Sequence, residues 1–321
     1  MLKKRREKKL RIDNQGWINR FYAVVKYEML WNIRKKKFYA ILVVAFVLTT
    51  LTLAGSHIQS AITGNPVELD PDFVINSNIG LGGFGFFLFA IVTVMNSISG
   101  EFESGTIVPL LAKPVSRTTV FLGKLFAAFL TLLVTYVLLG TYMTIGGLVI
   151  YGPQNNLHLL PLSLVGALFS TLIWVSIVIT FGTLFRSSLI AAIGALGIWL
   201  GTNIVGSIIG TLAGQGWILT YIPGSGSSGS VGGNPMVGTA IGTGTDNIGP
   251  NLINYILHPS WNVTYYKIDL ASSTQGVPVW QALNTEPLSN IILTSIGVAI
   301  LYFVILITLS WFAFRRAQIT E

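Results

Sequence analysis

Six long apolar runs constrain the fold of this chain more than any other feature. They cover residues 38–56, 79–99, 125–151, 162–184, 189–213 and 288–314. None of these runs contains Asp, Glu, Lys, Arg or His. A helix of about 20 residues crosses a hydrocarbon layer of about 30 Å, so each run has the length of a transmembrane span. Only 10% of the residues are charged, well below the share in soluble domains. The sequence predicts an all-α membrane protein with six transmembrane helices.

The basic residues are distributed unevenly between the two predicted sides of the membrane. Residues 1–37 hold 13 of the 20 Lys and Arg. With three in the segment 100–124, Arg186, Arg315 and Arg316, the same side of the membrane carries 19. The other side carries only Lys267, together with six acids. Because Lys and Arg accumulate in cytoplasmic loops, we expect both termini and the segment 100–124 to be cytoplasmic. The external loops are then 57–78, 152–161 and 214–287.

The first 37 residues precede the spans and are strongly basic. We interpret residues 2–11 as an anchor to anionic lipid rather than a tail that binds nucleic acid. Apolar residues then recur at helical spacing, which predicts an amphipathic helix in the cytoplasmic interface. Glu28 lies at the edge of the apolar face, where it either has a partner or reaches water. The apolar face consists of Ile18, Phe21, Tyr22, Val25, Met29 and Ile33.

The segment 100–124 is polar and lies between the second and third runs. Glu101 and Glu103 follow directly on the second span, where acids oppose the dipole of the preceding helix. We therefore expect a cation to hold Glu101, with Arg117 or Arg34 as candidates. The alternative is that both acids face water. An exposed pair of this kind contributes only about 0–1 kcal/mol to stability.

Small and polar residues within the spans indicate where helices pack. The fifth span carries two glycine stripes, which suit close contact within the subunit or across a dimer. Asn203 is expected to hydrogen-bond to another helix, the alternative being a contact with substrate; Asn96 and Asn203 are the candidates to line a pathway. The packing glycines are Gly197, Gly201, Gly206 and Gly210.

The external segment 214–287 divides into two parts. Residues 224–249 are rich in Gly, Ser and Thr, which is typical of flexible loops. The following residues contain several aromatics, and we expect short helices there that rest on the spans as a cap.

Several kinds of chemistry have no support in the sequence. There is no cysteine, and the three histidines have no metal-ligand spacing. No Gly-x-x-x-x-Gly-Lys-Ser/Thr phosphate loop and no catalytic set is present. No ionisable residue lies within the spans, which disfavours a proton-driven carrier. We expect no catalytic residue, cofactor or metal on this chain.

A pattern of about 25 residues carries a family resemblance. It consists of Glu101, Ser104-Gly105-Thr106, Leu110-Leu111, Pro114-Val115-Ser116-Arg117 and Gly123-Lys124. In this pattern and in the order of its elements, the chain resembles the permease subunits of type-2 ABC transporters. In that family the loop after the second span docks on a separate ATPase subunit. The resemblance implies a coupling loop here with Glu101, Glu103, Gly105, Thr106, Leu110, Pro114 and Arg117 as its site residues. The stretch 27–34 resembles the family's first helix, which implies a role for Glu28 and Arg34.

These observations together predict a function and an organisation. We interpret the chain as the permease subunit of an ATP-driven exporter, with ATP and Mg bound by the partner ATPase. A homodimer is favoured over a heterodimer, in the plasma membrane of a prokaryote. The alternatives are a secondary carrier or channel, and a membrane scaffold or sensor that does not transport. The predicted parts are the tail and first helix (1–37), spans one to five (38–213), the external cap (214–287) and the last span with its tail (288–321).

Overall fold

Six membrane-length helices form the body of the molecule. The computed structural model describes residues 2–67, 69–106, 115–212, 216–224, 226–234, 236–269 and 279–316. Within these residues, six helical segments are long and apolar enough to cross a membrane, which confirms the predicted six spans. The segments are Lys36–Thr63, Gly82–Glu103, Arg117–Ile150, Leu157–Phe185, Ser188–Gly210 and Leu288–Arg316.

The element order follows the predicted spans closely. The α-helices are α1 (Leu2–Arg34), α2 (Lys36–Thr63), α3 (Phe73–Asn76), α4 (Gly82–Val94), α5 (Ser99–Glu103), α7 (Arg117–Ile150), α8 (Leu160–Phe185), α9 (Ser188–Ser207), α10 (Ile248–Leu257) and α11 (Leu288–Arg316). Short 3-10 turns are η1 (Asn78–Gly80), η2 (Leu157–Leu159), η4 (Gly216–Tyr221) and η5 (Thr245–Asn247), and η3 (Ile208–Leu212) is a π-helical turn. The strands are β1 (Ser228–Val231), β2 (Thr239–Gly242), β3 (Asn262–Asp269) and β4 (Val279–Pro287).

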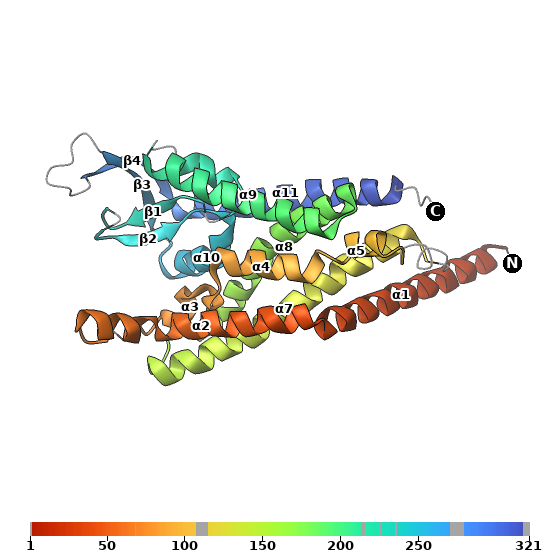
Figure 1. Cartoon of the computed structure of the whole chain (residues 1–321), viewed down its shortest axis with the longest axis horizontal. Coiled ribbons are helices and arrows are strands. Elements are labelled where there is room, and N and C mark those ends of the chain that lie inside the picture. Colours follow the sequence, from red (N-terminus) through yellow and green to blue (C-terminus); the bar gives the residue numbers. More distant parts are fainter. Residues whose placement is uncertain are drawn as a thin grey trace.

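The helices are arranged around α8. In its apolar stretch 72% of the residues are buried, compared with 17% in the fifth span and 22% in the first. α8 contacts α4, α7, α9, α10 and α11. Figure 1 shows the start of α1 and the end of α11 at one end of the molecule and the strands at the other. An even number of spans produces this arrangement.

Local signals explain where the helices that frame the site begin. Ser116 caps α7, because its side chain accepts a hydrogen bond from the backbone N–H of Thr119. Ser187 caps α9 in the same way through Ile190. Arg186 adopts a left-handed conformation with φ 53° and ends α8. α7 has 34 residues, so it rises about 51 Å. That is longer than a hydrocarbon layer of about 30 Å.

The external segment corrects one prediction. Instead of a flexible loop and short helices alone, it contains a four-stranded antiparallel sheet in the order β2-β1-β3-β4, together with α10. The sheet packs on the start of α11 through a cluster of Ile241, Val263, Leu288, Ile291 and Ile292. α10 lies against α8 so closely that a Cβ atom added at Gly166 would lie 2.2 Å from the backbone of Gly249. The cap therefore has its own buried contacts with the spans.

Candidate functional site

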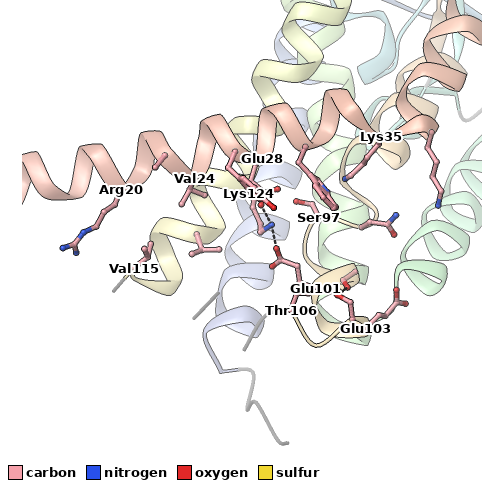
Figure 2. A pocket seen from close by; sticks show the side chains of 18 of the residues that line it. Arg20, Val24, Glu28, Lys35, Ser97, Glu101, Glu103, Thr106, Val115 and Lys124 are labelled. Atoms are coloured by element: carbon pink, nitrogen blue, oxygen red, sulfur yellow. Dashed lines mark hydrogen bonds and ion pairs between the residues drawn. The ribbon is translucent and has the colours of Figure 1, made fainter. Parts of the chain in front are cut away.

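A buried cluster of charged residues joins three helices at the end of the molecule that holds both termini. The Lys124 ammonium of α7 lies 2.5 Å from Glu28 of α1 and 2.7 Å from Glu101 of α5. The side chain of Lys124 is 3% exposed, that of Glu28 7% and that of Glu101 19%. Figure 2 shows Lys124 between the two carboxylates. One cation therefore connects α1, α5 and α7; we call this cluster the three-helix junction.

Close packing of α1 on α7 brings the first pair together. Trp17 donates a hydrogen bond of 3.0 Å from Nε1 to the hydroxyl of Thr119. Farther along both helices, a Cβ atom added at Gly123 would lie 2.6 Å from Val24. The residue numbers of both contacts rise in the same direction along the two helices, so α1 and α7 run parallel. Glu28 lies one turn beyond Val24, which places it on Lys124.

The charges of the junction do not balance. Lys124 offsets one of the two carboxylates, and the Oε2 atom of Glu101 is buried without a hydrogen-bond partner. Lys35 lies nearby and donates a hydrogen bond of 3.0 Å to the side-chain oxygen of Asn32. Burial lowers the pKa of Lys35 to about 8, and the attraction of Glu28 offsets only part of this effect. Removing the partner of a buried charge is strongly destabilising, so the junction depends on Lys124.

Glu103 makes a second connection from the same helix. Its carboxylate accepts hydrogen bonds of 2.7 Å from the backbone N–H of Ser188 and 2.6 Å from the Ser188 hydroxyl. Ser188 is the first residue of α9. An anion at a helix N-terminus satisfies free N–H groups and complements the helix dipole. α5 is thereby attached both to α1 and α7 and to the start of the fifth span.

The structure corrects the predicted partner of Glu101. Its cation is Lys124, not Arg117 or Arg34. The guanidinium of Arg117 instead donates a hydrogen bond of 2.9 Å to the backbone oxygen of Arg315, and Arg34 is exposed. The predicted loop 100–124 is also shorter than expected, because α7 already begins at Arg117. Lys124 lies two turns inside that helix, where its side chain points at α1 and α5.

The remaining residues of the predicted coupling loop are partly described. Gly105 has a φ of 69° and forms the turn after α5, a conformation that favours glycine. The hydroxyl of Thr106 lies 2.9 Å from that of Ser104. Leu110 and Pro114 lie outside the described residues. The roles of these four residues in coupling stay predictions.

The glycines of the fifth span have different surroundings. A side chain added at Gly197 or Gly201 would meet no described atom within 4 Å, so these two do not pack against another span of this chain. Gly206 and Gly210 instead approach Leu219 of η4, and Gly210 also approaches Ser227. Gly206 and Gly210 therefore pack within the subunit, whereas Gly197 and Gly201 face open space among the described residues.

The two asparagines lie in different environments. Asn203 donates a hydrogen bond of 2.8 Å to the backbone oxygen of Trp199 in its own helix. Asn96 lies at the break between α4 and α5 and borders the cavity beside the junction. A role for either in a pathway stays a prediction.

Sequence reasoning did not select Lys124 as a site residue. It was assigned to a polar loop, where a lysine is ordinarily solvated. The available signal was its position seven residues after Arg117, next to Gly123 and within an otherwise apolar stretch. At helical spacing this places a lone cation on a packed face.

The fold and the junction define a polytopic α-helical membrane protein in which buried ion pairs connect three helices at the end that holds both termini. The chain matches the family described as ABC-2 family transporter protein over residues 22–319. It therefore belongs to the ABC-2 transporter family and is a transmembrane permease of an ABC transporter. A comparison with curated proteins found no match.

Proposed function

We propose that this permease works as an exporter, energised by a separate ATPase subunit that docks on the segment 100–117. ATP and Mg bind to that partner, and two copies of the permease form the path. The complex lies in the plasma membrane of a prokaryote with both termini of this chain in the cytoplasm. The excess of Lys and Arg at one end supports that orientation.

The three-helix junction is the observation that carries this proposal. Glu101 lies at the start of the segment 100–117, and Lys124 lies on α7 seven residues after its end. Their ion pair, together with Glu28, closes the base of the segment. Glu103 attaches the same short helix to α9. A displacement of α5 would therefore be transmitted to α1, α7 and α9, to which Glu101 and Glu103 connect it.

We assign ATP hydrolysis to the partner subunit because the sequence of this chain contains no phosphate loop. We expect the purified chain to hydrolyse no ATP above background and to form a stable complex when it is produced with its ATPase. A measurable turnover by the chain alone would contradict this part of the proposal.

Site-specific crosslinking tests the docking surface. The chain has no cysteine, so Ser104→Cys and Ser228→Cys each introduce a single thiol. Both positions are exposed, Ser104 after α5 and Ser228 in β1. A thiol-linked photocrosslinker at residue 104 should capture the ATPase in membranes, and the same reagent at residue 228 should not. The absence of crosslinking at 104, or equal crosslinking at both positions, would overturn the docking site.

A further inference from the structure

A cavity lies beside the three-helix junction. Its volume is about 1170 Å³, and it is bounded by α1, the start of α2, α5 and the start of α7. Lys36 and Lys37 border it where the first span begins, and Glu103 borders it where the second span ends. Given the orientation proposed above, these limits of the two spans place the cavity at the depth of the lipid headgroups on the cytoplasmic side.

The acids around this cavity are already engaged. Glu28 and Glu101 bond to Lys124, and Glu103 bonds to Ser188. Within the described parts of the chain, the ion pairs are those two of Lys124. Each of these three carboxylates therefore already has a partner, although the Oε2 atom of Glu101 has no hydrogen bond of its own.

The cations around the cavity are in excess. Lys35, Lys36, Lys37 and Arg20 all border it, and no described carboxylate forms an ion pair with any of them. Lys35 bonds only to a neutral amide oxygen, and burial lowers its pKa to about 8. α2 also begins here without a side-chain cap, so lysines add to the positive end of its dipole. An anion in the cavity would relieve this excess.

Aromatic side chains form an apolar surface of the cavity next to these cations. Tyr27 and Trp31 border the cavity, are 64% and 53% exposed, and stack with ring centroids 6.4 Å apart. The Lys35 ammonium lies 5.8 Å from the Trp31 ring. Exposed aromatic rings beside lysines are typical of the headgroup region of a bilayer. This combination suits an anionic amphiphile better than a fully solvated acidic protein surface.

We infer that this cavity binds an anionic phospholipid of the cytoplasmic leaflet. Lys36 and Lys37 hold its phosphate, Lys35 adds a third positive charge, and the first part of an acyl chain lies along Tyr27 and Trp31. Anionic lipid in that leaflet attracts basic segments in general, but the cavity adds a defined position next to the junction. A bound lipid would connect α1 and α2 with α5 at the point where the ATPase is proposed to act.

Native mass spectrometry of the full chain in detergent tests this inference. We expect added dioleoyl phosphatidylglycerol to bind more tightly than dioleoyl phosphatidylcholine. Each lysine near anionic lipid contributes about a factor of five, so Lys36→Gln/Lys37→Gln should weaken phosphatidylglycerol binding about 25-fold. The matched control Lys26→Gln/Arg316→Gln removes the same charge from exposed positions of α1 and α11 that do not border the cavity and should bind like the parent.

Several outcomes would overturn the inference. An equal loss of binding in the control pair would indicate general surface attraction. Displacement of the lipid by excess inorganic phosphate would indicate a site for free phosphate. Unchanged lipid binding in the Lys36→Gln/Lys37→Gln variant, with loss of ATPase co-purification, would assign the lysines to a protein partner. Single variants at Lys36 and Lys37, each expected to weaken binding about fivefold, provide the test if the double variant does not fold. The ATPase crosslink is a separate measurement on the Ser104→Cys variant, in which Lys36 and Lys37 are unchanged, although Ser104 also borders the cavity.

Discussion

The ammonium of Lys124 lies 2.5 Å from the carboxylate of Glu28, although 96 residues separate the two in the chain. The same ammonium also binds Glu101. A single buried cation thus faces two acids from different helices. The three residues are not equivalent, because only Lys124 takes part in both pairs.

The first prediction concerns this asymmetry. Lys124→Met leaves the buried Glu28 and the partly buried Glu101 without a counter-charge, and removing one partner of a buried pair typically costs about 3–5 kcal/mol. Glu101→Gln preserves the pair between Lys124 and Glu28 and should lower the free energy of unfolding by much less. Denaturant unfolding of the chain in detergent measures both. The triple variant Glu28→Gln/Lys124→Met/Glu101→Gln should recover much of the stability, since no buried charge remains. Equal unfolding midpoints for Lys124→Met and Glu101→Gln would mean that packing, and not charge, maintains the junction.

The burial of this cluster also changes the expectation formed from the sequence. In the sequence analysis the ion pair of Glu101 was treated as exposed, with a contribution of about 0–1 kcal/mol to stability. In the structure the Lys124 side chain is 3% exposed. We therefore expect substitutions here to lower stability, so a transport assay that tests the proposed coupling role needs a stability measurement beside it.

The second prediction concerns Glu103 and the first turn of α9. Glu103→Ala removes the acceptor of the Ser188 N–H, so this amide should exchange with solvent faster than in the parent. Hydrogen exchange with mass spectrometry of the full chain reports this directly. Glu103→Gln keeps an acceptor oxygen and serves as the control, with exchange close to that of the parent. Identical exchange in the Ala variant would show that the contact does not order this turn in solution.

The third prediction is a pH dependence that arises from Lys35. Its pKa is about 8 in the folded protein and 10.5 as the ordinary value. Below pH 8 both states are protonated, and the cost of burying the ammonium is fully present. Between pH 8 and pH 10.5 the unfolded state holds more protons, so folding becomes more favourable as pH rises. Thermal unfolding of the parent and of Lys35→Gln across this window should show a rise in the parent that the variant lacks. Parallel curves would contradict the assignment to Lys35.

The spans were predictable because membrane length and hydrophobicity act locally. Each apolar run corresponds to one helix, with limits that differ from the predicted ones by at most eight residues. The partner of Glu101 was not predictable in the same way. It depends on where α7 begins, and the cap at Ser116 moves Lys124 from a loop onto a packed helix face.

The external sheet was missed although its signal was present. In β3 the sequence Asn-Val-Thr-Tyr-Tyr-Lys-Ile-Asp is rich in β-branched and aromatic residues, and Val263 and Tyr265 are buried on one face. These aromatics were interpreted as membrane-interface residues instead. Strand pairing also brings together β1 and β3, which lie more than 30 residues apart, and a local pattern does not reveal such a contact.

The fourth prediction distinguishes packed from open glycines. Gly166→Ala would place a methyl group 2.2 Å from the backbone of Gly249. Overpacking of this kind typically costs about 1–3 kcal/mol, and the chain should unfold at a lower denaturant concentration. Gly197→Ala meets no described atom and should leave the unfolding of the single chain unchanged. If Gly197→Ala weakens a dimer in size-exclusion chromatography with light scattering, a second copy of the chain covers the helix surface at Gly197 and Gly201. Equal stability of Gly166→Ala and the parent would contradict the close contact between α8 and α10.

The last prediction concerns the side of the membrane on which each end lies. Asn19→Cys places a thiol at an exposed position of α1, and Ser228→Cys places one in β1 at the opposite end of the molecule. In intact cells an impermeant thiol reagent should label residue 228 and leave residue 19 unlabelled until the membrane is permeabilised. The physical reason is the charge asymmetry: the end with α1 carries nearly all the Lys and Arg, which remain on the cytoplasmic side. Labelling of residue 19 in intact cells would show that the proposed orientation is wrong. The side on which the ATPase and the lipid are proposed to bind would then be wrong as well.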